Sequence, residues 1–344
     1  MAITEKERLL AAAKRETVDR PPCICPGGMM NMMFQEIMEQ SGYRWPEAHS
    51  DPEKMAGLVN ALHDAGGFEN FGVPFDMTVE AEAMGATVNM GDLLCEPHVV
   101  ASPLASSAEV EKLHPMDLEH GRAKAVLDAI RILNGQNSGT PIIGTVTGAV
   151  STAGTLVDMS VLMRECLKKP DAVKALFDYV NRQLIRYTRA MVDAGADVIC
   201  IAEPSGTGEI LGPAKFRKYT IAYANELLDA VEVPVKIVHI CGSLHAVYDL
   251  LDEFHCDAFS VESCVPLRTV APYLQHKALM GNIGTQALCE QQPEKISAMV
   301  HTAAVSGADI IAPACGISTL TPLANVRAMV NASRAEDGGA PWQK

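Results

Sequence analysis

Short apolar runs alternate along the chain with longer segments in which apolar residues recur at helical spacing. The short runs contain few internal polar residues, which is typical of parallel strands buried on both faces. They lie at residues 22–26, 71–75, 141–146, 197–204, 233–242, 257–263, 278–284 and 309–316. The pattern therefore predicts eight strands separated by helices.

The segment 171–193 shows the helical pattern clearly, because its apolar residues fall on one face and Gly195 supplies a stop signal. Alternation of strands and helices predicts an α/β fold, a single (β/α)8 barrel of the TIM type. An open, doubly wound sheet is the competing architecture. It would carry a glycine-rich phosphate loop after the first strand, and residues 23–33 lack the required spacing.

A length of 344 residues suits one large barrel with additions. We therefore expect a single domain over residues 1–344, with a helical extension at the amino terminus. The longest interruption of the alternation, about residues 84–123, is polar and marked by prolines. We interpret it as an insertion that covers the mouth of the barrel.

Charge and composition exclude several classes of partner. The formal net charge of −14 and the pI near 5.2 leave no basic surface for nucleic acid. No apolar run approaches the roughly 20 residues of a membrane span, and the amino terminus is not signal-like, so we expect a cytoplasmic protein without membrane contact. The ten cysteines are spread along the chain, which favours reduced thiols over a disulfide framework.

Polar residues that close the predicted strands are the candidates for chemistry, because the carboxyl ends of barrel strands carry active sites. These residues are Asp76, Glu203, His239, Cys241, Glu262, Asn282 and Cys315. His239 and Cys241 are two residues apart, so their side chains share one face of a strand. Cys315 ends the last predicted strand, and we expect the three side chains to converge above the barrel.

An imidazole and two thiolates suit tetrahedral Zn²⁺, and three protein ligands leave a fourth position open for a substrate. Spacing alone favours packing over a metal site, because buried cysteines are common core residues. Glu262 also has two interpretations. It is either a reversible fourth ligand that an incoming thiol displaces or a carboxylate outside the coordination sphere.

Two sequence blocks carry a resemblance to a known family. HICG (239–242) and PACGISTLTPLANVRAMV (313–330) are similar to the H-x-C…C pattern of methylcobalamin:coenzyme M methyltransferases in the uroporphyrinogen decarboxylase superfamily. The resemblance covers nearly the whole chain, through ERLLAAAKRETVDRPP (7–22), VPFDMTVEAEAMG (73–85), AEPSGTGEILGPAKFRKY (202–219) and ALMGNIGTQ (278–286). It implies a (β/α)8 barrel with zinc held by His239, Cys241 and Cys315.

Departures from the decarboxylase pattern favour the methyltransferase branch. The decarboxylases have an R-Q-A-G-R-Y segment after the first strand, whose arginines hold substrate carboxylates, whereas this chain has PGGMMNMM (26–33). They also have histidine in a G-H-G-I block that here reads ACGI (314–317). The resemblance therefore implies methyl transfer between methylcobalamin and a thiol such as coenzyme M. No segment resembles the D-x-H-x-x-G of a cobalamin-binding domain, so a separate corrinoid protein is the expected partner.

Two further carboxylates are candidates for catalysis. Asp76 lies nine residues before Gly85, as the catalytic aspartate of the decarboxylases does, and it is otherwise a strand-end or helix-cap carboxylate. Glu203 matches an acidic strand-end position of the superfamily and is expected to orient His239 or a substrate.

Three other functions are retained beside thiol methylation. The first is a methyltransferase that takes methyl groups from methoxylated or methylated compounds and loads a corrinoid protein. The others are a decarboxylase-like enzyme and a noncatalytic zinc-binding barrel. Superfamily members are often dimers, so a homodimer is possible.

Overall fold

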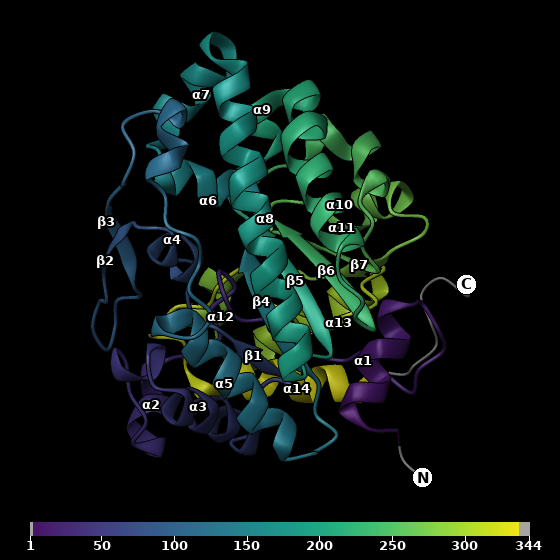
Figure 1. Cartoon of the computed structure of the whole chain (residues 1–344). Coiled ribbons are helices and arrows are strands. Elements are labelled where there is room, and N and C mark those ends of the chain that lie inside the picture. The colour runs from purple at the N-terminus through teal and green to yellow at the C-terminus, as the bar shows by residue number, and fades with distance from the viewer. Residues whose placement is uncertain (1–2, 337–344) are drawn as a thin grey trace.

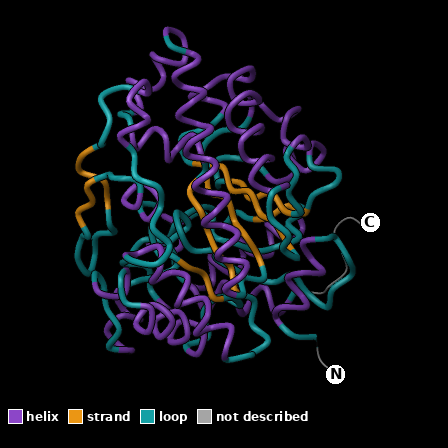
Figure 2. The backbone as a smooth tube through the Cα atoms, in the orientation of Figure 1, coloured by secondary structure: helices purple, strands orange, loops and turns teal. Residues whose placement is uncertain are grey.

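The computed structural model describes residues 3–336, in which a parallel sheet forms most of a barrel wall (Figures 1 and 2). Six strands pair in the order β1–β4–β5–β6–β7–β8. Nearly all their residues are buried, which explains the absence of polar alternation. Their bounds are β1 (Phe71–Val73), β4 (Ile142–Thr147), β5 (Val198–Glu203), β6 (Val235–Ile240), β7 (Ala258–Val261) and β8 (Ala278–Met280).

Two of the predicted strands, 22–26 and 309–316, close the ring but form only isolated bridges. Cys23 pairs in parallel with Ile311, and a second bridge joins the late segment to β8. The Glu69 N–H donates to the Cys23 carbonyl at 2.9 Å, which links the ring to the start of β1. Both segments contain prolines, which have no N–H to donate to a ladder. The predicted (β/α)8 barrel is confirmed, with these two segments less regular than their apolar pattern predicts.

Helices surround the barrel, and the longest, α8 (Pro170–Ala194), crosses the front of the sheet in Figure 1. Pro170 begins α8, and Gly195 ends it in a left-handed conformation. The other α-helices are α1 (Glu5–Ala13), α2 (Gln35–Ser41), α3 (Pro52–Asp64), α4 (Val79–Ala83), α5 (Gly121–Gly135), α6 (Ala149–Leu156), α7 (Met159–Lys168), α9 (Gly208–Lys215), α10 (Ala222–Asp229), α11 (Leu267–Val270), α12 (Thr285–Glu290), α13 (Pro293–Val305) and α14 (Leu323–Ala335).

Short helices of other types fill several connections. A π-helical segment spans η3 (Phe216–Ile221), and 3₁₀ helices span η1 (Glu47–His49), η2 (Ser107–Lys112), η4 (His245–Glu253) and η5 (Ala271–Tyr273). Within residues 3–336, no helix is long and apolar enough to cross a bilayer.

The segment 84–123 leaves the barrel and returns to it. It contains an antiparallel hairpin of β2 (Thr87–Asn89) and β3 (His98–Ala101), which lies at the margin of the molecule in Figure 1. The Thr319 hydroxyl donates to the Leu94 carbonyl at 3.0 Å. This contact fixes the loop between β2 and β3 against the chain that follows Cys315.

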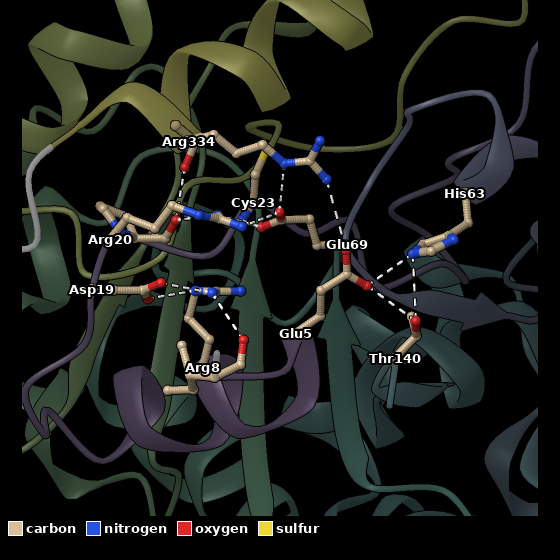
Figure 3. Close-up of polar contacts among 12 residues, drawn as sticks. Glu5, Arg8, Asp19, Arg20, Cys23, His63, Glu69, Thr140 and Arg334 are labelled. Carbon is tan, nitrogen blue, oxygen red and sulfur yellow. Dashed lines mark hydrogen bonds and ion pairs between the residues drawn. The ribbon is translucent and has the colours of Figure 1, made fainter. Parts of the chain in front are cut away.

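A network of charged side chains lies at the amino-terminal end of the barrel, where the strands begin (Figure 3). Glu69 is buried just before β1 and pairs with Arg20 at 2.6 Å and with Arg334 of α14 at 3.0 Å. Glu5 of α1 lies 2.8 Å from Nε2 of His63 on α3 and 3.7 Å from Arg334. The network therefore joins α1, α3 and α14 beneath the barrel.

Candidate metal centre at the barrel mouth

Three potential metal ligands meet at the carboxyl end of the barrel. His239 lies in β6, Cys241 follows that strand directly, and Cys315 follows the segment that closes the ring. One donor atom from each lies within 4.8 Å of the other two. The Cys241 sulfur is 3.4 Å from His239 Nε2 and 3.3 Å from the Cys315 sulfur. Ligands of a tetrahedral zinc ion are separated by roughly 3.5–3.8 Å, so the group needs only a small expansion to hold Zn²⁺.

Ser260 sets the orientation of His239. The two residues are register partners on β6 and β7, and Nδ1 of the buried His239 lies 2.9 Å from the Ser260 hydroxyl. A proton on Nδ1 would be donated to this hydroxyl, which leaves the lone pair of Nε2 facing the two sulfurs. Sequence reasoning missed Ser260, because its position opposite His239 depends on the register between two strands.

The two thiols differ in their proton affinity. A hydrogen bond from Cys241, the neighbouring His239 and the Gly316 N–H lower the pKa of Cys315, although burial opposes them. The hydrogen bond to Cys315 and burial raise the pKa of Cys241. One sulfur of the pair is therefore prepared as a thiolate that the other thiol stabilises. Gly316 is required in this turn, because a Cβ there would lie 2.6 Å from the Met29 carbonyl oxygen.

Glu262 lies next to this group but outside it. It follows β7 directly and is partly exposed. Its carboxylate accepts hydrogen bonds from the Ser263 hydroxyl at 2.8 Å and the Cys264 thiol at 3.2 Å. Its negative charge contributes to the raised pKa of Cys241. The carboxylate therefore lies near the cysteines but is bonded to its own loop.

Asp76 is buried among partners of its own. Its carboxylate pairs with Arg122, lies 3.2 Å from His49 Nδ1, and accepts from the N–H and hydroxyl of Thr78 at 2.8 and 2.6 Å. Burial opposes ionisation, but the charge of Arg122 and the contact with His49 hold the pKa of Asp76 far below its usual range. These contacts favour the structural interpretation of Asp76.

Glu203 contacts a helix end instead of His239. Its buried carboxylate accepts from the N–H groups of Val150, Ser151 and Gly206 at 3.0, 2.9 and 3.1 Å and also from the Ser151 hydroxyl. Burial raises the pKa of Glu203, and these hydrogen bonds oppose that rise. The expected role of orienting His239 falls to Ser260, and Glu203 serves the amino terminus of α6.

Glu96 is a mouth residue that sequence reasoning missed. It is half-buried in the loop between β2 and β3. Burial raises the pKa of Glu96 to about 8, with added effects of the negative charges of Asp76 and Cys315. The carboxyl therefore lies within electrostatic reach of the metal ligands. Its place follows from the docking of the 84–123 segment, which no local pattern indicates.

Comparison with known proteins agrees with this geometry. A profile described as uroporphyrinogen decarboxylase (URO-D) matches residues 4–336. The chain is 34% identical over 335 residues to methylcobamide:CoM methyltransferase MtbA of Methanosarcina acetivorans, covering 96% of this chain and 98% of the relative. A uroporphyrinogen decarboxylase of Syntrophotalea carbinolica is 26% identical over 279 residues, covering 76% of this chain and 78% of that protein.

A solved structure gives the same result. A methyltransferase from Methanosarcina mazei superposes with a TM-score of 0.88 at 33% identity, covering 96% of this chain and 98% of that one. The barrel and the full-length matches together show that this chain belongs to the uroporphyrinogen decarboxylase family.

Proposed function

We propose that this chain is a zinc-dependent methyltransferase that moves a methyl group between a corrinoid and a thiol such as coenzyme M. In the forward direction a sulfur–carbon bond forms while the cobalt–carbon bond of methylcob(III)alamin breaks and leaves its electron pair on cobalt. The observation that carries the proposal is the convergence of His239, Cys241 and Cys315. Relatives of nearly full-length similarity are named as methyltransferases, one of them for coenzyme M.

The side chains at the barrel mouth would have separate roles in this reaction. When bound, Zn²⁺ lowers the pKa of a coordinated thiol, which is otherwise near 8.5, so that a thiolate exists at neutral pH. His239, Cys241 and Cys315 would hold the ion and leave a fourth position for the substrate sulfur. Ser260 orients His239, and Glu262, whose charge raises the pKa of Cys241, would compete for the fourth position.

The corrinoid would be presented by a separate protein that docks on the mouth. Large apolar side chains are exposed in loops that follow the barrel strands or contact them. Met77 follows β1 and is 46% exposed, Leu320 follows Cys315 and is 60% exposed, and Leu94, at 49%, lies beside Thr319. A contiguous patch of exposed apolar residues is typical of a protein contact, and we propose that these three contribute to one.

Location and assembly belong to the same proposal. All ten cysteines are free, which supports a reducing compartment such as the cytoplasm. A homodimer belongs to the proposal because members of the superfamily are often dimers. Light scattering after size-exclusion chromatography should then give about twice the chain mass of 36.8 kDa, and a single-chain mass would contradict the dimer.

Metal analysis combined with a methyl-transfer assay tests the proposed activity. We expect about one zinc per chain and loss of methylcobalamin absorbance when coenzyme M is added. Zinc without thiol-dependent demethylation would favour the substrate-demethylating or noncatalytic alternatives. A metal-free protein that transfers methyl groups at full rate would overturn the mechanism, and one with neither zinc nor transfer would favour a decarboxylase-like barrel.

A further inference from the structure

The loop after β7 occupies both oxygens of the Glu262 carboxylate. The Ser263 hydroxyl donates to Oε1 at 2.8 Å, and the Cys264 thiol donates to Oε2 at 3.2 Å. Both donors come from the two residues that follow Glu262, so the loop makes these contacts without help from another element. The carboxylate therefore has a defined resting orientation within its own loop.

Asn282 holds the backbone of this loop in place. Its side-chain amide donates to the carbonyl oxygens of Glu262 at 2.9 Å and Val265 at 2.8 Å. The Val265 N–H closes a turn onto the Glu262 carbonyl at 3.0 Å. Because the main chain is fixed, rotation of the Glu262 side chain is enough to move its carboxylate.

The position of the carboxylate makes such a movement relevant to the metal centre. Glu262 is not among the three residues whose donor atoms lie within 4.8 Å of one another. Its charge nevertheless raises the pKa of Cys241, and the N–H of Gly242, the residue after Cys241, helps to lower the pKa of Glu262. The carboxylate thus rests beside a metal ligand while its oxygens are engaged elsewhere.

We propose that Ser263 and Cys264 are positioning residues that hold the Glu262 carboxylate away from the open coordination position and so keep that position available to the thiol substrate. This inference rests on the proposed zinc-dependent function. A hydrogen bond to a charged acceptor shifts an equilibrium by roughly tenfold. Loss of both side-chain donors leaves only the N–H groups of Cys264 and Gly242 acting on the Glu262 carboxylate, so it competes more readily with the incoming thiol.

Thiol binding to the cobalt-substituted protein tests this role without catalysis. Co²⁺ replaces zinc, its visible absorption reports coordination, and 2-mercaptoethanesulfonate is titrated as the probe thiol. In the Ser263→Ala/Cys264→Ala variant we expect the Kd for the thiol to rise about tenfold. Adding Glu262→Gln should remove this difference, because the competing carboxylate is then absent.

Matched controls separate positioning from general damage to the fold. Ser263→Thr and Cys264→Ser keep a hydroxyl donor and should bind the thiol as the unmodified protein does. Cys289→Ala removes a partly buried thiol on α12, outside the metal centre, and should also leave the Kd unchanged.

The outcomes distinguish the inference from the function on which it rests. If the Ser263→Ala/Cys264→Ala variant binds Co²⁺ through thiolates and binds the thiol with an unchanged Kd, that result would overturn the positioning role alone. A Kd increase that persists in the Glu262→Gln background also overturns it. Absence of thiolate-to-cobalt absorption would overturn the metal site itself and the inference with it.

Discussion

Cys241 and Cys315 lie in contact but hold their protons with different strength. The pKa of Cys315 is lowered by the hydrogen bond from Cys241, and the pKa of Cys241 is raised by the same contact. A metal ion that enters this site meets one sulfur that is already disposed to ionise. The two sulfurs act as a pair, so loss of either one should weaken metal capture.

Replacement of Cys315 by alanine should remove most of the bound zinc, because only two protein ligands remain and protein zinc sites use three or four. We expect the zinc content to fall from about one ion to about 0.1 ion per chain after dialysis, with loss of methyl transfer. Atomic absorption and the methylcobalamin assay measure these quantities. Cys289→Ala serves as the control, and retention of zinc by the Cys315 variant would remove this residue from the ligand set.

Replacement of Ser260 by alanine tests the contact that orients His239. Outer hydrogen bonds of this type typically change metal affinity about 10–100-fold, so zinc should bind more weakly while the barrel stays folded. Competition with a chromophoric chelator gives the affinity. Ser260→Thr keeps the hydroxyl at this strand position and should preserve most of the zinc affinity. Equal zinc affinity in Ser260→Ala and the unmodified protein would show that His239 is held by packing alone.

Sequence could predict which three side chains meet at the barrel mouth but not their surroundings. The spacing of His239 and Cys241 on one strand and the place of Cys315 at the end of another were enough to predict convergence in a barrel. Ser260 and Glu96 could not be found, because their positions depend on strand register and on a docked loop. Glu203 lies at the predicted strand end but serves a helix terminus.

At the scale of elements, the apolar pattern identified every segment of the barrel wall but not the quality of its pairing. The segments 22–26 and 309–316 are as apolar as their neighbours, yet each contributes only isolated bridges. Both segments contain proline, which has no N–H to donate. How much this disrupts pairing depends on which edge of the strand faces its partner. The hairpin of β2 and β3 was predicted only as a polar interruption.

The amino terminus of α6 offers a prediction at the same scale. Glu203→Gln keeps the shape of the side chain but removes the charge that accepts from three N–H groups. We expect a loss of about 1–3 kcal/mol in the free energy of unfolding, measured by urea denaturation. Zinc content should stay unchanged, because the carboxylate does not contact His239. Loss of zinc with unchanged stability would assign Glu203 to the metal centre instead.

At the scale of the whole molecule, the candidate metal site and the charged network that stabilises the fold lie at opposite ends of the barrel. The proposed metal ligands lie where strands end, and the network of Glu5, His63, Glu69, Arg20 and Arg334 lies where they begin (Figure 3). This division is usual for barrels of this type, in which the amino-terminal face supports stability. Changes beneath the barrel should therefore alter unfolding more than they alter metal binding.

The pair of Glu5 and His63 predicts how stability depends on pH. The hydrogen bond to Glu5 raises the pKa of His63 against the effect of burial. Although burial opposes it, the contact with His63 also lowers the pKa of Glu5. The His63 contribution is complete below its unfolded pKa and is lost as pH rises through the folded one. The Glu5 contribution is complete above its unfolded pKa and is lost as pH falls through the folded one.

The pair should therefore stabilise most between the unfolded pKa of Glu5 and the unfolded pKa of His63. Thermal unfolding measured from about pH 4 to 9 should show this maximum, and Glu5→Gln should flatten both of its sides. A Tm profile of the Glu5→Gln variant that runs parallel to that of the unmodified protein would show that the pair adds nothing to pH dependence.

The three proposed ligands also have a consequence for how the protein would acquire zinc. Cys241 and Cys315 are 74 positions apart, and the second belongs to the segment that closes the ring. During synthesis the ribosome releases two donors long before the third, so a nascent chain has only an incomplete site. Zinc would therefore be retained stably only after the segment 309–316 has closed the barrel. The zinc content of the protein could then report the fraction of chains that have finished folding.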